Sequence, residues 1–493
     1  MNTFNWTVIY PEAWLLLAAC VVTLADVFNN DPDRKPTFWL TQASVAIFSG
    51  LHLAAFNGGA TAYGLSGMVV TDPMGHLLAG FAGLAVMITL GYARPTLAAR
   101  DMQKGEFYTL TLFVLLGISV MTSANNFLVV YLGLELMSLS LYALAALRRD
   151  HAVSTEAAMK YFVLGALASG FLLYGLSMMY GATGTLEIPR VFERIATGKI
   201  NKEVLVFGVV FVVAGLGFKL GAVPFHMWVP DVYQGAPTPV TLLIGGAPKL
   251  AAFAMTVRLL VEGMLGLAID WQQMFIVMAV GSLVVGNVAA IAQTNLKRML
   301  AYSTIAQMGF IVLGLSAGVV SGNTLSAANA YSSAMFYLVA YVLTTLGTFG
   351  LVMYLSRQGF ESEEIADLAG LARRVPWVAG VMTVFMFSLA GLPPMVGFFA
   401  KLAVIQALVT TNQALYIWMA VFAVMFSLIG AYYYLRIVKV MWFDEPGQTS
   451  PVVQGPGVTA LLALNGAAVL MFGIFSGGLL ALCRDAIQRT FTT

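Results

Sequence analysis

The fold is decided by the stretch from residue 215 to residue 250, which reads GLGFKLGAVPFHMWVPDVYQGAPTPVTLLIGGAPKL. It begins as the end of an apolar run that holds Lys219, breaks at Pro224, and resumes as an apolar run that holds Lys249. Proline removes a backbone hydrogen-bond donor and clashes with the preceding helical turn. Because an unsatisfied backbone group in hydrocarbon costs several kcal/mol, a broken segment at membrane depth must be buried in protein or line a wet cavity. The stretch therefore predicts a functional site inside a membrane domain.

The composition of the whole chain predicts an all-α polytopic membrane protein. Of the 493 residues, 59% are hydrophobic and only 10% are charged. Apolar runs long enough to cross a bilayer, about 20 residues each, recur from end to end. The two cysteines, Cys20 and Cys483, lie in apolar segments near opposite ends of the chain, which indicates neither a disulfide framework nor a thiolate metal site.

The apolar runs predict fourteen transmembrane helices. The amino-terminal region lacks the basic segment that opens a secretory signal peptide, so Val8–Ala25 is expected to be a retained first helix. The seventh and twelfth helices exceed a simple span and contain proline breaks, at Pro224 and at Pro393-Pro394. The expected segments are residues 8–26, 37–56, 74–93, 107–123, 126–147, 156–181, 203–232, 238–260, 271–292, 298–318, 325–356, 375–409, 414–442 and 457–480.

The two broken helices are five helices apart, which predicts an inverted repeat. Since five is odd, a five-helix unit is inserted upside-down relative to its copy, as in transporters whose broken helices meet near the midplane. Helices 4–8 and 9–13 are interpreted as this pair. The expected domains are a three-helix segment, two five-helix repeats and a carboxy-terminal helix, at residues 1–106, 107–262, 263–443 and 444–493.

The basic residues of the connections predict the orientation. Roughly twice as many Lys and Arg residues fall in the connections on one side as on the other. Lys297 is counted on the more basic side, and Arg258 on the less basic side. Because positively charged loops stay in the cytoplasm, both termini are expected on the opposite, periplasmic side.

Four charged residues lie at membrane depth: Glu135, Lys219, Lys249 and Lys401. A central charge costs at least about 2.5–3.5 kcal/mol on insertion scales, so such residues face the bundle interior and mark ion paths. The alternative is a buried ion pair that only fixes helix packing. Three lysines and one acid cannot neutralise each other pairwise, and this surplus favours groups that change protonation.

These residue types suit proton transfer. A desolvated lysine loses its proton more readily, and a nearby carboxylate holds it, so Glu135 is expected to switch Lys219 between keeping and releasing a proton. Arginine could not release its proton in this way. His226 lies seven residues after Lys219 and is either a relay towards Lys249 or a histidine bonded to backbone freed by the break. Both interpretations stay open.

No phosphate-binding loop, nucleotide fingerprint, cysteine cluster or ligand-spaced histidine pair is present in the sequence. The chain is therefore expected to hold no metal and no redox cofactor, and no nucleic acid is expected as a partner. Its partners are expected to be the lipid bilayer and other membrane proteins.

Four motifs resemble one known family, the antiporter-like membrane subunits of respiratory complex I, the bacterial proton-pumping NADH:quinone oxidoreductase. The resemblance covers essentially the whole chain. The motifs are GFKLGAVPFHMWVPDVYQGAPTPV at 217–240, QTNLKRMLAYSTIAQMGF at 293–310, YLGLELMSLSLYAL at 131–144 and SLAGLPPMVGFFAKL at 388–402.

The resemblance implies inverted five-helix repeats, half-channels centred on the broken helices, and proton translocation driven by quinone reduction in other subunits. It makes Glu135 the helix-5 glutamate, Lys219 the helix-7 lysine, Lys249 the central helix-8 lysine and Lys401 the helix-12 exit residue. It also implies a bacterial inner membrane, neighbouring subunits M, J and K, and NADH, FMN, iron–sulfur clusters and quinone in partner subunits.

Two features separate the chain from other branches of that family. Subunit M relatives carry a glutamate where this chain has Lys401, and subunit L relatives carry a long lateral helix after the last transmembrane helix. This chain ends soon after the fourteenth expected helix. The resemblance is therefore closest to the branch that has neither feature.

Two other functions remain open on the residues alone. A cation/proton antiporter subunit of the Mrp type would need the same lysines, but a sodium path should add carboxylates or clustered hydroxyls as oxygen ligands at membrane depth. A scaffold bundle with inert charges is the third interpretation.

Overall fold

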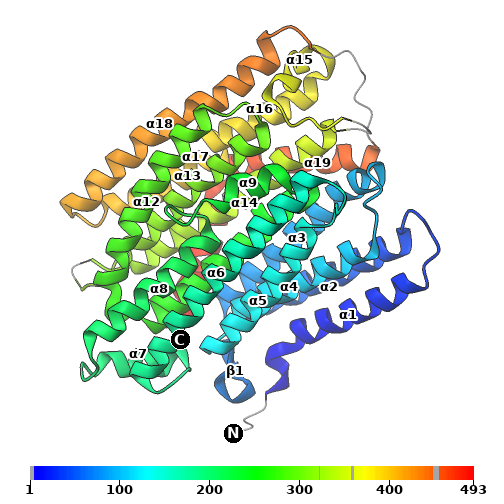
Figure 1. The fold of residues 1–493 in the computed structure, drawn as a ribbon. Coiled ribbons are helices and arrows are strands. Elements are labelled where there is room, and N and C mark those ends of the chain that lie inside the picture. Colours follow the sequence, from blue (N-terminus) through cyan, green and yellow to red (C-terminus); the bar gives the residue numbers. More distant parts are fainter. Residues whose placement is uncertain (1–4, 321, 357–359, 448–454, 493) are drawn as a thin grey trace.

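The computed structural model describes residues 5–320, 322–356, 360–447 and 455–492, which form one bundle of helices that run side by side (Figure 1). Thirteen helical stretches of the described residues are long and apolar enough to cross a membrane. Together with the shorter apolar pair α16 (Pro376–Ala390) and α17 (Val396–Val409) they make fourteen crossing segments. These correspond one to one with the fourteen segments expected from the sequence.

The amino-terminal part contains three crossing helices and a small hairpin that the sequence analysis did not predict. Strands β1 and β2 pair antiparallel, with Tyr63 opposite Val70. The elements are η1 (Trp6–Ile9), α1 (Tyr10–Val27), α2 (Lys35–Gly58), β1 (Ala62–Gly64), η2 (Leu65–Gly67), β2 (Val69–Thr71) and α3 (Pro73–Ala99).

The next five crossing segments end with two interrupted helices. The polar connection between the sixth and seventh segments forms a short amphipathic helix, α7. The elements are α4 (Gly105–Ser123), α5 (Phe127–Ala145), α6 (Ala152–Thr183), α7 (Ile188–Ala196), α8 (Lys202–Leu220), α9 (Trp228–Gly235), α10 (Thr238–Gly245), α11 (Ala247–Thr256) and the π-helix η3 (Val257–Gly263).

The remaining segments pack against these and close the bundle. The elements are η4 (Leu265–Leu267), α12 (Ala268–Ile291), α13 (Leu296–Ser316), α14 (Ala327–Leu355), η5 (Ile365–Leu368), α15 (Leu371–Arg374), α16, α17, α18 (Ala414–Phe443), α19 (Pro456–Ile474) and α20 (Ser476–Thr492).

Side-chain caps fix where several helices begin. Asp72 accepts a hydrogen bond from the Gly75 amide at 2.8 Å and starts α3. Asn126 and Asn295 do the same for α5 and α13. A side-chain oxygen at this position satisfies one of the four amides that a helix start leaves without a partner.

The expected breaks in the seventh and twelfth helices are confirmed. Helix α8 ends at Gly221 with φ +78°, and α16 ends at Gly391 with φ +83°. Glycine adopts this left-handed backbone without strain, whereas other residues do not. A proline follows each glycine within three residues, at Pro224 and Pro393, and prevents the helix from resuming at once.

The eighth segment was expected to be continuous, and this expectation is wrong. The helix is interrupted at Gly246, whose φ of −102° and ψ of −106° lie outside the helical region. Pro248 explains the interruption, because its ring would clash with the carbonyl of residue 244 in an unbroken helix. The new helix, α11, begins at Ala247 and carries Lys249.

The expected single carboxy-terminal helix at 457–480 is also divided. Helix α19 ends at Ile474, and α20 begins at Ser476, next to Gly477 and Gly478. Helix α20 packs against α14 and α3, and the Thr490 hydroxyl accepts a hydrogen bond from the Met74 amide. The start of η1, the β-hairpin, α7 and the end of α20 therefore lie at the same end of the bundle (Figure 1).

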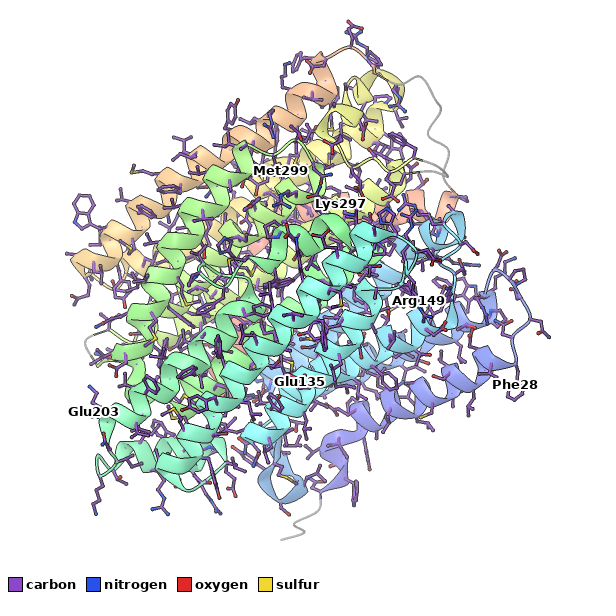
Figure 2. All side chains as sticks on the ribbon, in the orientation of Figure 1. Phe28, Glu135, Arg149, Glu203, Lys297 and Met299 are labelled. Atoms are coloured by element: carbon purple, nitrogen blue, oxygen red, sulfur yellow. The ribbon has the colours of Figure 1, made fainter. Side chains whose placement is uncertain are left out.

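The centre of the bundle is formed by the eighth and tenth crossing segments. The most apolar part of Thr238–Gly263 is fully buried, and 94% of that of Leu296–Ser316 is buried. Figure 2 shows Glu203 at one end of the bundle, Arg149 and Lys297 at the other, and Glu135 between them. The fold therefore places the segments that hold Lys249 and the 293–310 motif at its core.

Two basic residues that were assigned to connections are buried. The side chain of Arg258 is 2% exposed, and it pairs with Asp72 at 2.5 Å and with Glu262 at 2.7 Å. The side chain of Lys297 is 1% exposed and pairs with Glu363 at 2.9 Å. Both lie near helix ends, where a hydropathy pattern gives no sign of burial against a neighbouring helix.

Candidate functional site

Lys249 caps the broken end of α8. A helix end leaves its last four carbonyls without helical partners. The Lys249 ammonium donates to the carbonyls of Lys219 at 3.1 Å and Leu220 at 2.9 Å. The Trp228 indole donates to the Phe218 carbonyl at 2.9 Å, and the amide of Gly221 donates to Gly217. The break is therefore fully satisfied inside the protein, with a lysine as one of its caps.

Lys401 caps the broken end of α16 in the same way. Its ammonium donates to the carbonyls of Leu389 at 3.0 Å and Ala390 at 2.9 Å, the last two residues before Gly391. It also donates to the Ser427 hydroxyl at 2.8 Å. Lys249 and Lys401 are 1% and 8% exposed. The structure thus repeats one arrangement, a buried lysine on the last two carbonyls before a left-handed glycine, at both breaks.

These contacts remain satisfiable when a lysine loses its proton. An ammonium has three donors and no acceptor, whereas a neutral amine has two donors and one lone pair. Two donors suffice for the two carbonyls, and the lone pair of Lys401 can accept from the Ser427 hydroxyl. Either protonation state therefore leaves the helix end capped.

Lys219 and Glu135 are brought together on α8 and α5. The Lys219 ammonium donates to the Ser138 hydroxyl at 2.8 Å, one helical turn from Glu135. No ion pair involves Lys219 among the described residues, and its hydrogen bond to Ser138 places it beside the turn of α5 that carries Glu135. The Oε1 atom of Glu135 is buried and has no hydrogen-bond partner in the described part of the chain. Glu135 and Lys219 are thus near each other, but no ion pair or hydrogen bond joins them in the described part of the chain.

A hydrogen-bonded cluster on α13, α14 and α18 adjoins Lys401. Gln307 donates to the Leu389 carbonyl, the acceptor that it shares with Lys401, at 3.2 Å. Gln307 also donates to the Tyr434 hydroxyl at 3.0 Å and accepts from the Tyr337 hydroxyl. We call Gln307, Tyr337 and Tyr434 the glutamine cluster.

A second set of hydroxyls extends from the glutamine cluster towards Lys249. The Tyr341 hydroxyl donates to Thr304 at 2.9 Å, one turn before Gln307 on α13. The Tyr233 hydroxyl is buried near them, but it makes no hydrogen bond to either one in the described part of the chain. The Tyr233 ring contacts Trp228, over which the Lys249 ammonium lies at 5.4 Å. The side chains between the two lysines therefore include three hydroxyls, of Thr304, Tyr341 and Tyr233, that can each donate and accept hydrogen bonds.

His226 lies in the turn between α8 and α9 and is half-buried. No hydrogen bond joins its side chain to Lys219 or Lys249 within the described ranges, and its Nδ1 atom has no partner there. Lys249 reaches the backbone of Lys219 directly. The relay role of His226 stays a prediction without a contact that supports it.

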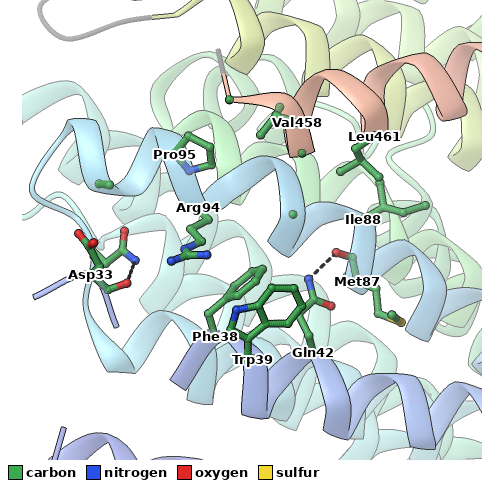
Figure 3. A pocket seen from close by; sticks show the side chains of 15 residues that line it. Asp33, Phe38, Trp39, Gln42, Met87, Ile88, Arg94, Pro95, Val458 and Leu461 are labelled. Carbon is green, nitrogen blue, oxygen red and sulfur yellow. Dashed lines mark hydrogen bonds between the residues drawn. The ribbon is translucent and has the colours of Figure 1, made fainter. Parts of the chain in front are cut away.

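A cavity of about 690 Å³ lies apart from the lysines, between α2, α3 and the start of α19 (Figure 3). Its walls are mostly apolar, and Arg94 lies over the Phe38 ring at 4.7 Å. In Figure 3, Gln42 is bonded to the Met87 carbonyl. In the described residues no group of three His, Cys, Asp or Glu side chains could hold a metal ion.

Comparison with known proteins places this arrangement in a family. Residues 124–427 match the family model described as NADH:quinone oxidoreductase/Mrp antiporter, TM. NADH-quinone oxidoreductase subunit N of Polaromonas naphthalenivorans (strain CJ2) is 60% identical over 99% of this chain and 98% of its own length. The chain belongs to the subunit N family. Subunit N of Herminiimonas arsenicoxydans is 59% identical over the full length of both chains.

Solved structures agree with this membership. A chain of respiratory complex I from Thermus thermophilus, with bound aureothin, has a TM-score of 0.81 and 31% identity, covering 97% of this chain and 100% of that one. A chain of the Mrp complex from Dietzia sp. DQ12-45-1b has a TM-score of 0.83 at 18% identity, covering 98% of this chain and 97% of that one. At this identity the second match shows a shared fold alone. The resemblance drawn from the sequence motifs, and the branch indicated by Lys401, are confirmed for the subunit N family.

The polar residues that surround the lysines were not predicted from the sequence. Ser138, Thr304 and Gln307 all lie inside the quoted motifs, spaced among apolar residues of buried helices. Single polar side chains in an apolar run are a weak signal, because Ser and Thr also bond to their own helix backbone. Only the packing of α13 against α16 and α18 shows that Gln307 adjoins Lys401.

Proposed function

We propose that this subunit N family member translocates protons through Glu135, Lys219, Lys249 and Lys401 as part of a proton-pumping NADH:quinone oxidoreductase. The observation that carries the proposal is the repeated lysine cap at the two broken helix ends. A buried lysine bonded to carbonyls and hydroxyls, rather than to a carboxylate, can lose its proton without leaving a buried charge unpaired.

The contacts support one order along the proposed path. Glu135 acts on Lys219, Lys249 lies against the backbone of Lys219, and hydroxyls extend from Lys249 towards Lys401. Moving a charge at Glu135 changes the proton affinity of Lys219, and each lysine in turn repels a proton on the next. Two inverted five-helix repeats, helices 4–8 and 9–13, would bring the two lysine caps to one polar axis from opposite sides.

The energy comes from other subunits under this proposal. Redox chemistry with NADH, FMN, iron–sulfur clusters and quinone belongs to partner subunits, and the chain lies in the bacterial inner membrane with both termini periplasmic. Glu135 borders the surface of the bundle between Leu132 and Leu139, which are 65% and 54% exposed. This exposed apolar face supports contact with neighbouring membrane subunits, for which M, J and K are our assignments.

Exchange of Lys219 by alanine in the assembled complex tests the proposal. We expect Lys219→Ala to abolish most quinone-coupled proton pumping in reconstituted vesicles, while the complex stays assembled. Lys202→Ala is the matched control, because the side chain of Lys202 is 73% exposed. Normal pumping by an assembled Lys219→Ala complex would overturn the residue assignment. The Mrp alternative predicts a dependence on sodium, and we expect none.

A further inference from the structure

A second hydrogen-bonded chain of polar side chains lies apart from Glu135 and the three deep lysines, in the first four crossing helices. It joins Glu12 on α1, His52 on α2, His76 on α3 and Ser119 on α4. The Ser119 hydroxyl donates to Glu12 Oε1 at 2.7 Å and contacts His52 Nε2 at 3.2 Å. The Nδ1 atoms of His52 and His76 are 2.9 Å apart. All four side chains are at least nine-tenths buried.

With Glu12 ionised, the hydrogen bonds allow one arrangement of the protons in this chain. A serine hydroxyl has one proton, so when Ser119 donates to Glu12, His52 Nε2 must donate to Ser119. His52 Nδ1 then carries a lone pair and accepts from His76 Nδ1–H. This leaves the lone pair of His76 on Nε2, while the only hydrogen bond of this ring within the described ranges is the one at Nδ1.

The free nitrogen of His76 is reachable from outside. His76 borders a cavity of about 320 Å³ that is also lined by Thr7, Tyr10 and Thr71, at the end of the bundle that holds the β-hairpin. A cavity of this size holds several waters. At the other end of this series of hydrogen bonds, Glu12 Oε2 is buried and has no hydrogen-bond partner in the described part of the protein.

We propose that His76, His52, Ser119 and Glu12 form a second proton-binding site, which takes one proton at His76 and holds it on Glu12. A proton enters His76 Nε2, and the Nδ1 proton of His76 passes to His52 Nδ1. The Nε2 proton of His52 passes to Ser119, and the Ser119 proton passes to Glu12. One proton enters and one carboxylate becomes a carboxylic acid, while every hydrogen bond in the chain reverses. The site goes beyond the proposed function, because neither Glu135 nor any of the three deep lysines takes part in it.

The charged groups around the chain are paired with each other. Asp72 and Glu262 both bind Arg258, which also donates to the Thr122 carbonyl at 3.0 Å. On α20, Arg489 pairs with Asp485 and lies over the Phe56 ring. Glu12 is therefore the acid that remains available for the proton.

Chemical modification of His76 reports the state of this chain. Diethyl pyrocarbonate reacts with a histidine nitrogen that carries a lone pair, so His76 is reactive before the proton enters and protected afterwards. The reaction is measured by peptide mass spectrometry on the purified, assembled complex across the pH range in which histidine titrates. His151, at the opposite end of the bundle, is the internal reference for the reagent.

We expect the pH of half-protection of His76 to fall by about one unit or more in Glu12→Gln, because the site can then hold a proton only as a buried imidazolium. Ser119→Ala interrupts the chain by removing one hydroxyl and should cause the same fall, with no further change in the double variant. Ser123→Ala is the matched control, because Ser123 also contacts Glu12, at 3.3 Å, but lies off the path.

Two results would overturn the proposal. One is an unchanged half-protection pH in Ser119→Ala, which shows that His76 and Glu12 titrate independently. The other is an equal fall in Ser119→Ala and Ser123→Ala, which shows a general loosening of α4. If Glu12→Gln prevents assembly, the comparison of Ser119→Ala with Ser123→Ala still tests the proposal.

Discussion

The three lysines of the candidate site donate to neutral oxygen atoms and not to carboxylates. Lys219 binds a hydroxyl, Lys249 binds two carbonyls, and Lys401 binds two carbonyls and a hydroxyl. A buried charge without a partner of opposite sign is expensive, and a group in this position tends to give up its charge. The choice of lysine over arginine matters here, since only lysine can become neutral.

This difference leads to a prediction at Lys219. We expect Lys219→Arg to pump protons almost as poorly as Lys219→Ala, because the guanidinium keeps its proton at any accessible pH. The measurement is quinone-coupled acidification of reconstituted vesicles, with assembly checked by native electrophoresis. Pumping at the wild-type rate in the arginine variant would mean that residue 219 acts only as a fixed charge.

At the scale of the element, each broken helix depends on one glycine. The left-handed backbone at Gly221 and Gly391 lets the helix end turn back so that its last carbonyls meet a lysine. A side chain at position 391 would lie 2.7 Å from Lys401 Cδ and 3.1 Å from Lys401 Nζ. The backbone conformation and the lysine cap are therefore linked.

We predict that Gly391→Ala destabilises the subunit by about 1–3 kcal/mol and displaces Lys401, because a non-glycine residue is strained in this region. The expected result is a lower temperature of complex disassembly together with weaker pumping. Gly380→Ala, in the same helix α16, is the matched control, since no atom outside its own helix lies within 4 Å of its new methyl group. Equal effects of both changes would argue against a role for the cap.

Helix α13 contributes a second prediction, at Gln307. Replacing Gln307 by leucine removes the group that joins the Leu389 carbonyl to two tyrosine hydroxyls. We expect the pumping rate to fall roughly tenfold, which corresponds to about 1.4 kcal/mol in the barrier.

The control for Gln307 is Gln293→Leu, where the amide bonds only to the Ala289 carbonyl within the described residues. The rates of proton pumping and of quinone reduction are compared in both variants. Retention of full pumping in an assembled Gln307→Leu complex would place the exit path elsewhere than along the glutamine cluster.

At the scale of the whole molecule, the two ends of the bundle differ in charge chemistry. One end holds ion pairs that join distant segments: Glu361 binds Arg100 at 2.9 Å and Arg148 at 3.2 Å. Burial and a hydrogen bond to Glu363 raise the pKa of Glu361, while Arg100 opposes this shift. The other end carries the β-hairpin, α7 and the end of α20 (Figure 1). The excess of basic residues at the ion-paired end predicts that it faces the cytoplasm.

Labelling of single cysteines tests this orientation. In a chain with Cys20 and Cys483 replaced by serine, we expect Glu203→Cys to react with a membrane-impermeant maleimide in spheroplasts. Arg149→Cys, at the opposite end of the bundle (Figure 2), should react only in inverted vesicles. Both positions are exposed. The reverse pattern would invert the topology and place both termini in the cytoplasm.

The sequence by itself determined the membrane fold, the crossing segments, the two proline breaks and the four deep charges. Each follows from a local property, such as apolar length, a missing amide or a charge inside a run. Only the tertiary structure decided that Lys249 caps α8 and that Lys401 caps α16, because the carbonyls concerned are 29 to 30 and 11 to 12 residues away. The burial of Glu12, Asp72 and Arg258 could not be seen in the sequence either. These residues lie within a turn or two of helix ends, where hydropathy cannot distinguish a charge that faces water from one that neighbouring helices cover.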